Sequence, residues 1–277
     1  MKIEMQNQNA PFYEALFNDL MCESFGFSFE PWHKLGLWDE RYESYSIIKN
    51  GAMLANVCIL AADLLVGGNK LKALQLGAVA TRRDYRGHGY SRMIIEHIIA
   101  KYPDTPMFLF ANKSVPDFYP RFGFERTQEH KQVLSVAINN KHEAVKLSPG
   151  DSRLTDLIYN RAVFSNILDC TNTQSVHIFH QIMDYSDDMY FLPERNAVVI
   201  AKQKGNKLLI ADIITEKQFT FDELAAFLPF SGVSEVEFGF SADSFGITDC
   251  WQEHNSILFT RGLMLPEKFR FPKMSET

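Results

Sequence analysis

The 277-residue sequence lacks several features that define common protein classes. Its 28 Lys and Arg are outnumbered by 34 Asp and Glu, giving a net charge of −6. It therefore has no basic field of the kind that attracts nucleic acid. Four cysteines are present without a C-x-x-C pair: Cys22, Cys58, Cys170 and Cys250. This scatter favours reduced, buried thiols over disulfides or a metal site. His177 and His180 have helical spacing but no third ligand follows in sequence, so no metal is expected.

Long apolar runs are also missing. The longest candidate, Ala52–Val66, is interrupted by Asn56 and Asp63 and is shorter than the ~20 residues that span a bilayer. Met1–Ala10 is polar and has no apolar segment typical of a signal peptide. We therefore expect a soluble, cytoplasmic protein with no membrane partner.

Strand and helix patterns alternate along the first half of the chain. Asn50-Gly51 is a two-residue turn typical of a hairpin between two apolar, strand-like runs. The expected elements are a helix over Pro11–Glu23, strands over Tyr42–Lys49, Ala52–Val66 and Leu71–Thr81, a helix over Arg92–Lys101, a strand over Met107–Ala111, a short helix that begins at Ser114, and a strand over Phe124–Val136.

The second half repeats this order. Expected helices are Leu154–Phe164, Val176–Met183 and Leu224–Leu228, the last opened by a capping box at Thr220–Glu223, and expected strands are Met189–Leu192, Ala197–Gln203, Lys207–Thr215, Val236–Phe240 and Ser256–Thr260. The repetition predicts an α+β protein in which a mixed, mostly antiparallel sheet flanked by helices is duplicated in tandem. We expect domains at 1–139 and 140–277.

The segment Val79–Arg92 carries the clearest chemical signal. A strand ends at Thr81, a polar loop follows, and a helix begins near Ser91. Unpaired amides over Arg86–Ser91 and the helix dipole would together bind an anion such as a pyrophosphate. Gly87 and Gly89 allow phosphate to approach the backbone closely, because they have no Cβ. The pattern is neither G-x-x-x-x-G-K-S/T nor G-x-G-x-x-G. The alternative is a glycine-containing turn without a ligand.

Val79-Ala80-Thr81, followed by Arg86-Gly87-His88-Gly89-Tyr90-Ser91, resembles the coenzyme A-binding motif Q/R-x-x-G-x-G/A of the GNAT N-acetyltransferases. The resemblance implies the GNAT fold and acetyl-CoA as co-substrate, with the strand backbone pairing with pantetheine and the loop amides holding the pyrophosphate. Ser91 departs from the usual Gly or Ala, but its small side chain is expected to keep binding intact. The implied cofactor-binding residues are Val79, Ala80, Thr81, Arg86, Gly87, His88, Gly89, Tyr90, Ser91, Arg92 and Asn112.

A second signature supports the same family. Asn112 followed by Phe118–Phe124 resembles the family's N…Y-x-x-x-G-F ending, in which the Tyr hydroxyl points at the coenzyme sulfur. The resemblance implies that Tyr119 is the catalytic general acid. A phenol with a pKa of ~10 stays protonated at neutral pH and can protonate a departing thiolate. The alternative role for Tyr119 is packing beneath the helix cap.

The resemblance covers residues 10–136. The tandem order and the ending Phe269–Ser275 further resemble two-domain GNAT proteins of the enhanced-intracellular-survival type. After Thr215 the second unit has neither glycine nor arginine, and Glu216 would repel a phosphate. We expect a degenerate GNAT-like domain that binds no coenzyme A. It would instead form a wall of the acceptor pocket or the interface of a homo-oligomer.

The base and the acceptor are less sharply defined. The strand Leu74–Ala78 has no acid, so the base candidates are Glu23, Glu30, Asp39, Glu40 and the carboxylate of Thr277, a role assigned in proteins of the enhanced-intracellular-survival type. The aromatic residues Phe25, Phe27, Phe29, Trp32 and Trp38, with acids between them, fit either a cationic amine or a core between the domains. The predicted function is acetyl transfer to a primary amine, as a small cationic molecule or a peptide. The alternative is a non-catalytic acyl-CoA-binding or interaction protein.

Overall fold

Three strands joined by two-residue turns begin the sheet in the computed structural model, which describes residues 4–6, 13–35, 40–140 and 145–277. Asn50-Gly51 (φ 52° and 73°) joins β2 (Tyr42–Lys49) to β3 (Ala52–Val66), and Gly67-Gly68 (φ 54° and 77°) joins β3 to β4 (Asn69–Thr81). These left-handed conformations favour glycine and asparagine. The predicted antiparallel meander is confirmed, and β1 (Glu4–Gln6) extends it beside β2.

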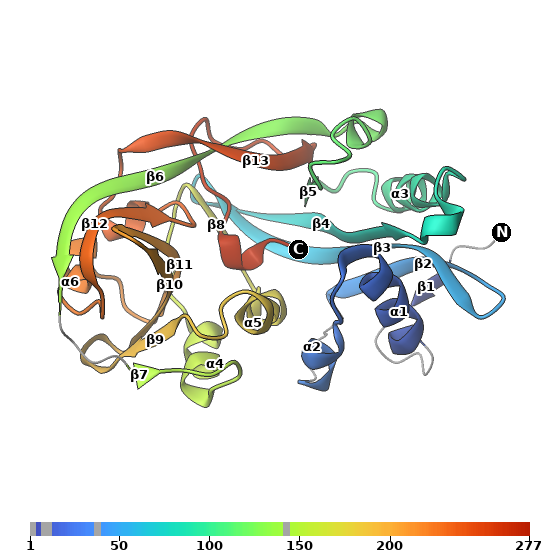
Figure 1. The fold of residues 1–277 in the computed structure, drawn as a ribbon. Coiled ribbons are helices and arrows are strands. Elements are labelled where there is room, and N and C mark those ends of the chain that lie inside the picture. Colours follow the sequence, from blue (N-terminus) through green and yellow to red (C-terminus); the bar gives the residue numbers. More distant parts are fainter. Residues whose placement is uncertain (1–3, 7–12, 36–39, 141–144) are drawn as a thin grey trace.

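Helices cover both faces of this meander (Figure 1). α1 (Tyr13–Phe25) and the short α2 (Glu30–Lys34) pack on one face, with Phe17 and Leu20 fully buried. α3 (Tyr90–Lys101) packs Ile94, Ile95 and Ile98 on the other face. Both faces of β3 are therefore buried, which explains its nearly continuous apolar sequence.

β5 (Met107–Phe110) runs parallel to β4, with Leu74 beside Met107 and Leu76 beside Leu109. After that point the two strands have no further paired residues. The helix expected from Ser114 is wrong: residues 113–118 form turns, and the helical turn η2 starts at Tyr119 and ends at Phe122. Asn112 explains the difference, because its Oδ1 accepts a hydrogen bond from the Ser114 amide (2.9 Å) and holds the chain in a turn.

The second half follows the predicted order with some differences. The helix expected over Leu154–Phe164 ends at Tyr159, a strand over Leu168–Thr171 was not predicted, and the last two strands begin five residues earlier than expected. The first half ends with β6 (Glu125–Asn139), and the second half has β7 (Val145–Lys146), α4 (Ser152–Tyr159), β8 (Leu168–Thr171), α5 (Gln174–Met183), β9 (Met189–Leu192), β10 (Ala197–Lys204), β11 (Lys207–Thr215), α6 (Phe221–Ala225), β12 (Ser231–Phe238) and β13 (Trp251–Arg261). β9, β10 and β11 form an antiparallel meander, and β12 runs parallel to β11. This repeats the arrangement of β2 to β5. The capping box at Thr220 and Glu223 is confirmed.

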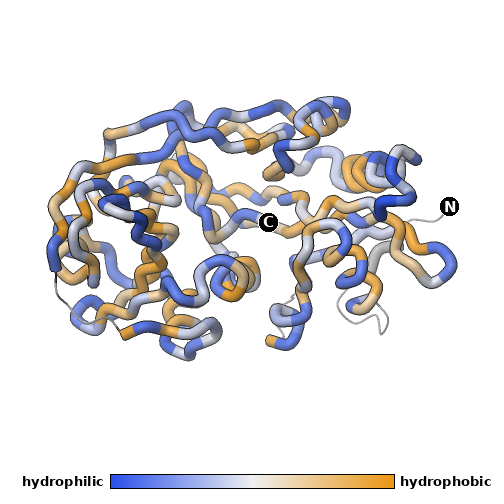
Figure 2. The backbone as a smooth tube through the Cα atoms, viewed as in Figure 1, coloured by the Kyte–Doolittle hydropathy of each residue, from blue (hydrophilic) through white to orange (hydrophobic). Residues whose placement is uncertain are grey.

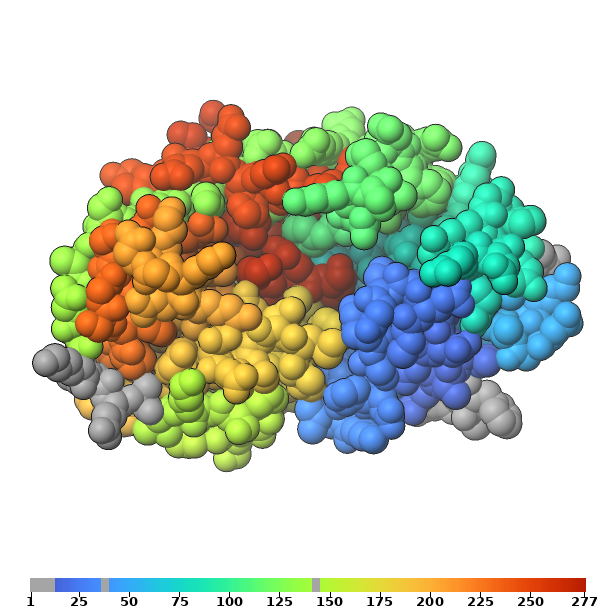
Figure 3. All heavy atoms as spheres, viewed as in Figure 1, coloured from blue at the N-terminus to red at the C-terminus, as the bar shows by residue number. Residues whose placement is uncertain are grey.

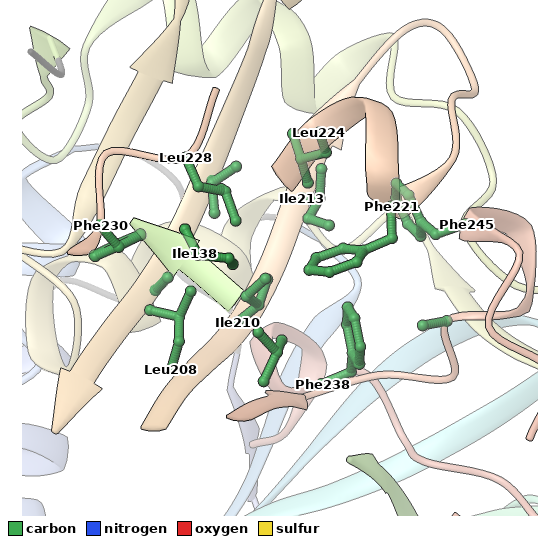
Figure 4. Packing of buried hydrophobic residues seen from close by; sticks show 14 of the residues in the cluster. Ile138, Leu208, Ile210, Ile213, Phe221, Leu224, Leu228, Phe230, Phe238 and Phe245 are labelled. Carbon is green, nitrogen blue, oxygen red and sulfur yellow. The ribbon is translucent and has the colours of Figure 1, made fainter. Parts of the chain in front are cut away.

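The second half has its own apolar core (Figure 4). Ile210 and Ile213 of β11 meet Phe221 and Leu224 of α6 and Phe238 of β12. The rings of Phe221 and Phe238 pack edge to face with centroids 5.2 Å apart.

Three described strands of the second half, β8, β12 and β13, pair with strands of the first. β13 lies between β5 and β6, with Leu258 beside Phe110 and Thr260 beside Glu125. β8 pairs with the end of β3. Within the described residues the strands form one continuous sheet in the order β1-β2-β3-β4-β5-β13-β6-β12-β11-β10-β9-β7. β3 and β4 are largely apolar, whereas the first part of β6 and the first part of β13 are largely hydrophilic (Figure 2).

The C-terminal segment lies between the halves. β11 and β12 are paired only as far as Ile210 and Phe238, and the segment fills the space beyond. The Lys273 amide donates to the Gly239 carbonyl (2.8 Å), and Met274 packs in a core cluster with Ala211 and Ile214. The last residues lie in the middle of the face shown in Figure 3, between the N-terminal helices and α5.

Candidate active site

A cavity of about 260 Å³ lies where β4 and β5 separate. Its walls come from both halves of the chain. The lining residues are Phe25, Phe27, Phe29, Trp32, Tyr42, Leu76, Gly77, Ala78, Val79, Phe110, Asn112, Val115, Tyr119, Val176, Phe179 and Thr277. The structure therefore brings the predicted site residues Val79, Asn112 and Tyr119 to one cavity.

A β-bulge shapes β4 at the cavity. Gly77 pairs with Cys58 and Ala80 with Asn56, so Ala78 and Val79 together stand opposite the single residue between them on β3. Ala78 has a φ of 46°, a left-handed conformation that is unusual for alanine. The buried Asn56 stabilises this conformation, because its Nδ2 donates to the Ala78 carbonyl (3.1 Å). The bulge interrupts regular pairing at the point where an open strand edge faces the cavity.

Beneath the bulge lies a buried polar cluster. Asn56 Oδ1 accepts hydrogen bonds from Ser46 Oγ (2.9 Å) and from Ser44 Oγ, and its Nδ2 also lies 3.2 Å from Cys58 Sγ. Burial raises the pKa of the Cys58 thiol to about 11. The thiol is therefore neutral at physiological pH. Cys58 and Cys170 are buried as predicted, whereas Cys22 and Cys250 are exposed, so the prediction of burial is wrong for these two. Nothing in the sequence pattern marked Asn56 as a site residue, since its partners come from three different segments.

The end of the chain reaches the cavity beside Gly77. A Cβ on Gly77 would lie 2.6 Å from Thr277 Oγ1, so glycine is required for this close approach. With its amide oxygen facing Thr277, the fully buried Gln75 accepts from the Thr277 amide (2.7 Å) and donates to the Ser275 carbonyl (3.0 Å). His180 Nε2 lies 2.6 Å from the Glu276 carbonyl oxygen. The terminal residues are thus fixed by contacts from both halves.

Tyr119 is 5 % exposed and lines the cavity. Its ring packs against Phe118 and Phe124 and against Phe259 of β13, with centroids 5.2, 6.3 and 5.8 Å away. Burial raises the pKa of Tyr119 to about 12. Among the hydrogen bonds made by the described residues, none involves its hydroxyl group. The phenol is therefore protonated over the physiological range and free to donate its proton into the cavity.

The glycine loop lies at the end of β4, exposed and outside the cavity lining. Gly87 and Gly89 have φ values of 78° and 77°. Gly89 is the N-cap of α3, and no side chain caps the helix there. Because the first helical bond runs from the Met93 amide to the Gly89 carbonyl (3.0 Å), the amides of the first turn have no partner within the helix. This arrangement fits the predicted anion site.

The other loop residues differ in their placement. Ser91 is not the N-cap: its Oγ lies 2.6 Å from Thr81 Oγ1 and joins the helix start to the strand end. Arg86, His88 and Arg92 are exposed. Arg86 Nε donates to the Thr81 carbonyl (3.2 Å), and Arg92 pairs with Glu96 on its own helix (2.8 Å). Tyr90 is partly buried at the start of α3, and Ala80 is buried on β4.

The candidate general bases differ in whether they reach the cavity. Glu23 accepts from Arg82 Nη1 (2.8 Å) and from the Arg83 amide (2.6 Å), and the exposed Glu30 pairs with Lys34 (2.8 Å). Glu40 is exposed, and Asp39 lies outside the described residues. Of the four candidates that the structure describes, Thr277 is the one that lines the cavity.

The aromatic stretch lines the cavity and also touches the second half. Phe29 stacks on Phe179 of α5 with centroids 5.1 Å apart; Trp38 lies outside the described residues. The sequence led us to expect the second half as a wall of the acceptor pocket or as an interface, but it did not identify α5 as the element that lines the cavity. Val176 and Phe179 were expected only as part of an amphipathic helix, and no local signal shows which helix faces a distant cavity.

No metal is suggested by the described part of the chain, which holds no cluster of three or more His, Cys, Asp or Glu able to bind one. His177 lies 2.9 Å from Asp212, and His180 lies 2.7 Å from Asp184. Both histidines therefore have protein partners. Among the described helices, none is long and apolar enough to cross a membrane.

Comparison with known proteins agrees with this geometry. The acetyltransferase (GNAT) domain family matches residues 12–127. Similar solved structures include Eis1 from Mycobacterium abscessus (13 % identity, 94 % of this chain and 73 % of that chain covered, TM-score 0.61) and GCN5-related N-acetyltransferases from Kribbella flavida (14 %, 94 %, 72 %, 0.57) and Anabaena variabilis (12 %, 94 %, 72 %, 0.56). A search of curated proteins found no match. At these identities the structural likeness shows the fold.

The mixed sheet with parting parallel strands and the similar solved structures show a GNAT fold. Within it, residues 12–127 match the acetyltransferase (GNAT) domain family. The resemblance inferred from the two sequence motifs is confirmed, and a tandem arrangement fits the length and the layout of the sheet.

Proposed function

We propose that the chain is an N-acetyltransferase that moves the acetyl group of acetyl-CoA to a primary amine. The observation that carries this proposal is the position of Tyr119 on a cavity between the parting β4 and β5 strands. Residues 1–139 hold the acetyl-CoA site in this proposal, and residues 140–277 form a unit without one.

The uncapped first turn of α3, together with Gly87 and Gly89, would hold the pyrophosphate of acetyl-CoA. The open edge of β4 at Val79–Thr81 would pair with the pantetheine arm. When bound, acetyl-CoA supplies a thioester whose carbonyl carbon accepts the amine. The remaining steps fall to the protein, which must orient the amine, take its proton and protonate the sulfur.

Tyr119 has the protonation state that its role demands. Its neutral phenol holds a proton at Oη, and that proton passes to the sulfur as the carbon–sulfur bond breaks. The amine loses a proton as the new carbon–nitrogen bond forms, and Thr277 is the candidate proton acceptor that lies at the cavity. Both proton transfers can therefore occur at the same cavity.

The test joins a thiol-release assay over a panel of amines to calorimetry with acetyl-CoA. Gly89→Val should abolish binding, because a branched side chain is strained at a φ of 77° and would obstruct the phosphates. Gly68→Val is the matched control, since Gly68 has the same φ of 77° in the β3–β4 turn and nothing within 4 Å of an added Cβ.

Binding within twofold of wild type in Gly89→Val would contradict the site. Tight binding of acetyl-CoA with no thiol release from any amine would favour the non-catalytic acyl-CoA-binding protein instead.

A further inference from the structure

The acceptor part of the cavity is walled by aromatic rings from both halves of the chain. Phe27 and Phe29 come from the segment between α1 and α2, Trp32 from α2, and Phe179 from α5. Phe179 lies 5.1 Å from Phe29, 6.0 Å from Phe27 and 5.7 Å from Trp32, measured between ring centroids. The second half thus contributes directly to the wall.

The polar atoms of these rings are already used by the protein. Trp32 Nε1 donates to the Ser175 carbonyl at the start of α5 (2.8 Å). Tyr42 is 4 % exposed, its hydroxyl is hydrogen-bonded to Cys58, and burial raises its pKa. These two side chains therefore present carbon surface to the cavity, and their hydrogen-bonding groups are not available to a polar ligand.

Acidic side chains are missing from the lining. Of the described residues that line the cavity, none is Asp or Glu. Two acids of the aromatic stretch have other partners: Glu23 is bound by Arg82 and the Arg83 amide, and Glu30 by Lys34. A second positive charge on the acceptor would lose its hydration among the rings without gaining a partner, which is unfavourable.

The volume limits the size of the acceptor. Sites for drug-sized ligands usually enclose roughly 300–1,000 Å³, whereas this cavity measures about 260 Å³. The same space must also receive the acetyl group beside Tyr119. What remains suits one ring or a short branched chain.

Resting on the proposed function, we infer that the acceptor is a small primary amine with a single charge and an apolar body, either aromatic or branched aliphatic. The amine faces Tyr119 and Thr277, and the apolar body packs against Phe27, Phe29 and Phe179. α5 of the second half is then a specificity element, and it acts by contact with the acceptor. Of the acids that suggested a cationic acceptor in the sequence, the three that the structure describes, Glu23, Glu30 and Glu40, do not line the cavity.

The experiment compares kcat/KM for 2-phenylethylamine with that for 1,5-diaminopentane and spermidine in the full-length protein. We expect at least about tenfold preference for the aromatic amine, the usual effect of matched apolar contacts. Phe179→Ala should lower kcat/KM for 2-phenylethylamine by about tenfold and leave acetyl-CoA affinity unchanged. Tyr159→Ala is the control, because Tyr159 is an aromatic residue of the second half that is 62 % exposed and outside the cavity.

Phe27→Ala repeats the test from the first half, so the result does not depend on the folding of one variant. Equal or better turnover of the diamine or spermidine overturns the inference and leaves the proposed acetyl transfer intact. The inference is likewise overturned if both Phe variants keep the wild-type preference. Absence of thiol release with every amine, despite acetyl-CoA binding, means instead that the proposed function itself fails.

Discussion

Tyr119 combines two properties that oppose each other in most proteins. Its ring belongs to an apolar cluster with Phe124 and Phe259, while its hydroxyl donates a proton in the proposed mechanism. Burial reconciles them, because desolvation disfavours the phenolate and keeps the proton on the oxygen. A structural role and a catalytic role therefore predict different outcomes for the same substitution.

Tyr119→Phe removes the proton donor and keeps the ring. We expect turnover to fall by about 10²–10⁴, with little change in acetyl-CoA affinity or melting temperature. Steady-state kinetics and thermal unfolding of Tyr119→Phe and Tyr119→Ala measure both effects. If the ring only packs, Phe retains activity and Ala loses stability. Since the acid acts while protonated and its pKa is raised to about 12, loss of its proton should cause no alkaline fall in kcat below about pH 11.

At the residue scale, the sequence predicted the groups that lie in contiguous motifs. Gly87, Gly89 and Tyr119 were identified because neighbouring residues define a loop or a cap. Gly77 and Asn56 were not, since each is required by a residue far away in the chain: Gly77 by Thr277, and Asn56 by the bulge at Ala78. Such requirements arise only when the distant segments have come together.

β4 is the element on which the site depends, since it carries the bulge and the contact with the C-terminal residue. Gly77→Ala would place a Cβ 2.6 Å from Thr277 Oγ1 and 3.0 Å from its Cβ. We expect the terminal residues to be displaced, with a lower melting temperature and a loss of activity. Adding Thr277→Gly removes both clashing atoms and should restore much of the stability, which a double-mutant cycle measures. Purely additive effects of the two substitutions would contradict the contact.

Elements with local signals were predicted closely, and those with distant partners were not. Asn50-Gly51 and the Thr220 capping box fix the bounds of their neighbours through local hydrogen bonds and backbone angles. The strand Ser256–Thr260 was expected, but its position between β5 and β6 was not. The sequence of a strand does not determine which other strands it pairs with. The helix expected from Ser114 failed for a local reason: Asn112 caps a turn there instead.

At the scale of the whole molecule, the spaces between the two pairs of parallel strands, β4–β5 and β11–β12, are occupied differently. The space between β4 and β5 is a cavity, whereas the space beyond the paired part of β11 and β12 is filled by Lys273 and Met274. We therefore expect the second half to have no room for a pantetheine arm. This adds a steric reason to the missing glycines and to the charge of Glu216.

We expect one coenzyme A to bind per chain. Native mass spectrometry and calorimetry of the full-length protein should give a stoichiometry of one, and Gly89→Val should reduce it to zero. A stoichiometry of two, or one bound molecule remaining in Gly89→Val, would show that the second half has kept a site.

The position of β13 also bears on how the protein is made. A ribosome releases β5 and β6 more than a hundred residues before the strand that separates them. Until then both strands carry open edges, which are prone to pair with other chains. The cavity needs Thr277 as well, so the site is completed only after the residues that follow β13 have emerged. The first half is thus synthesised early but finished late, and a nascent chain of this protein would gain from protection during that interval.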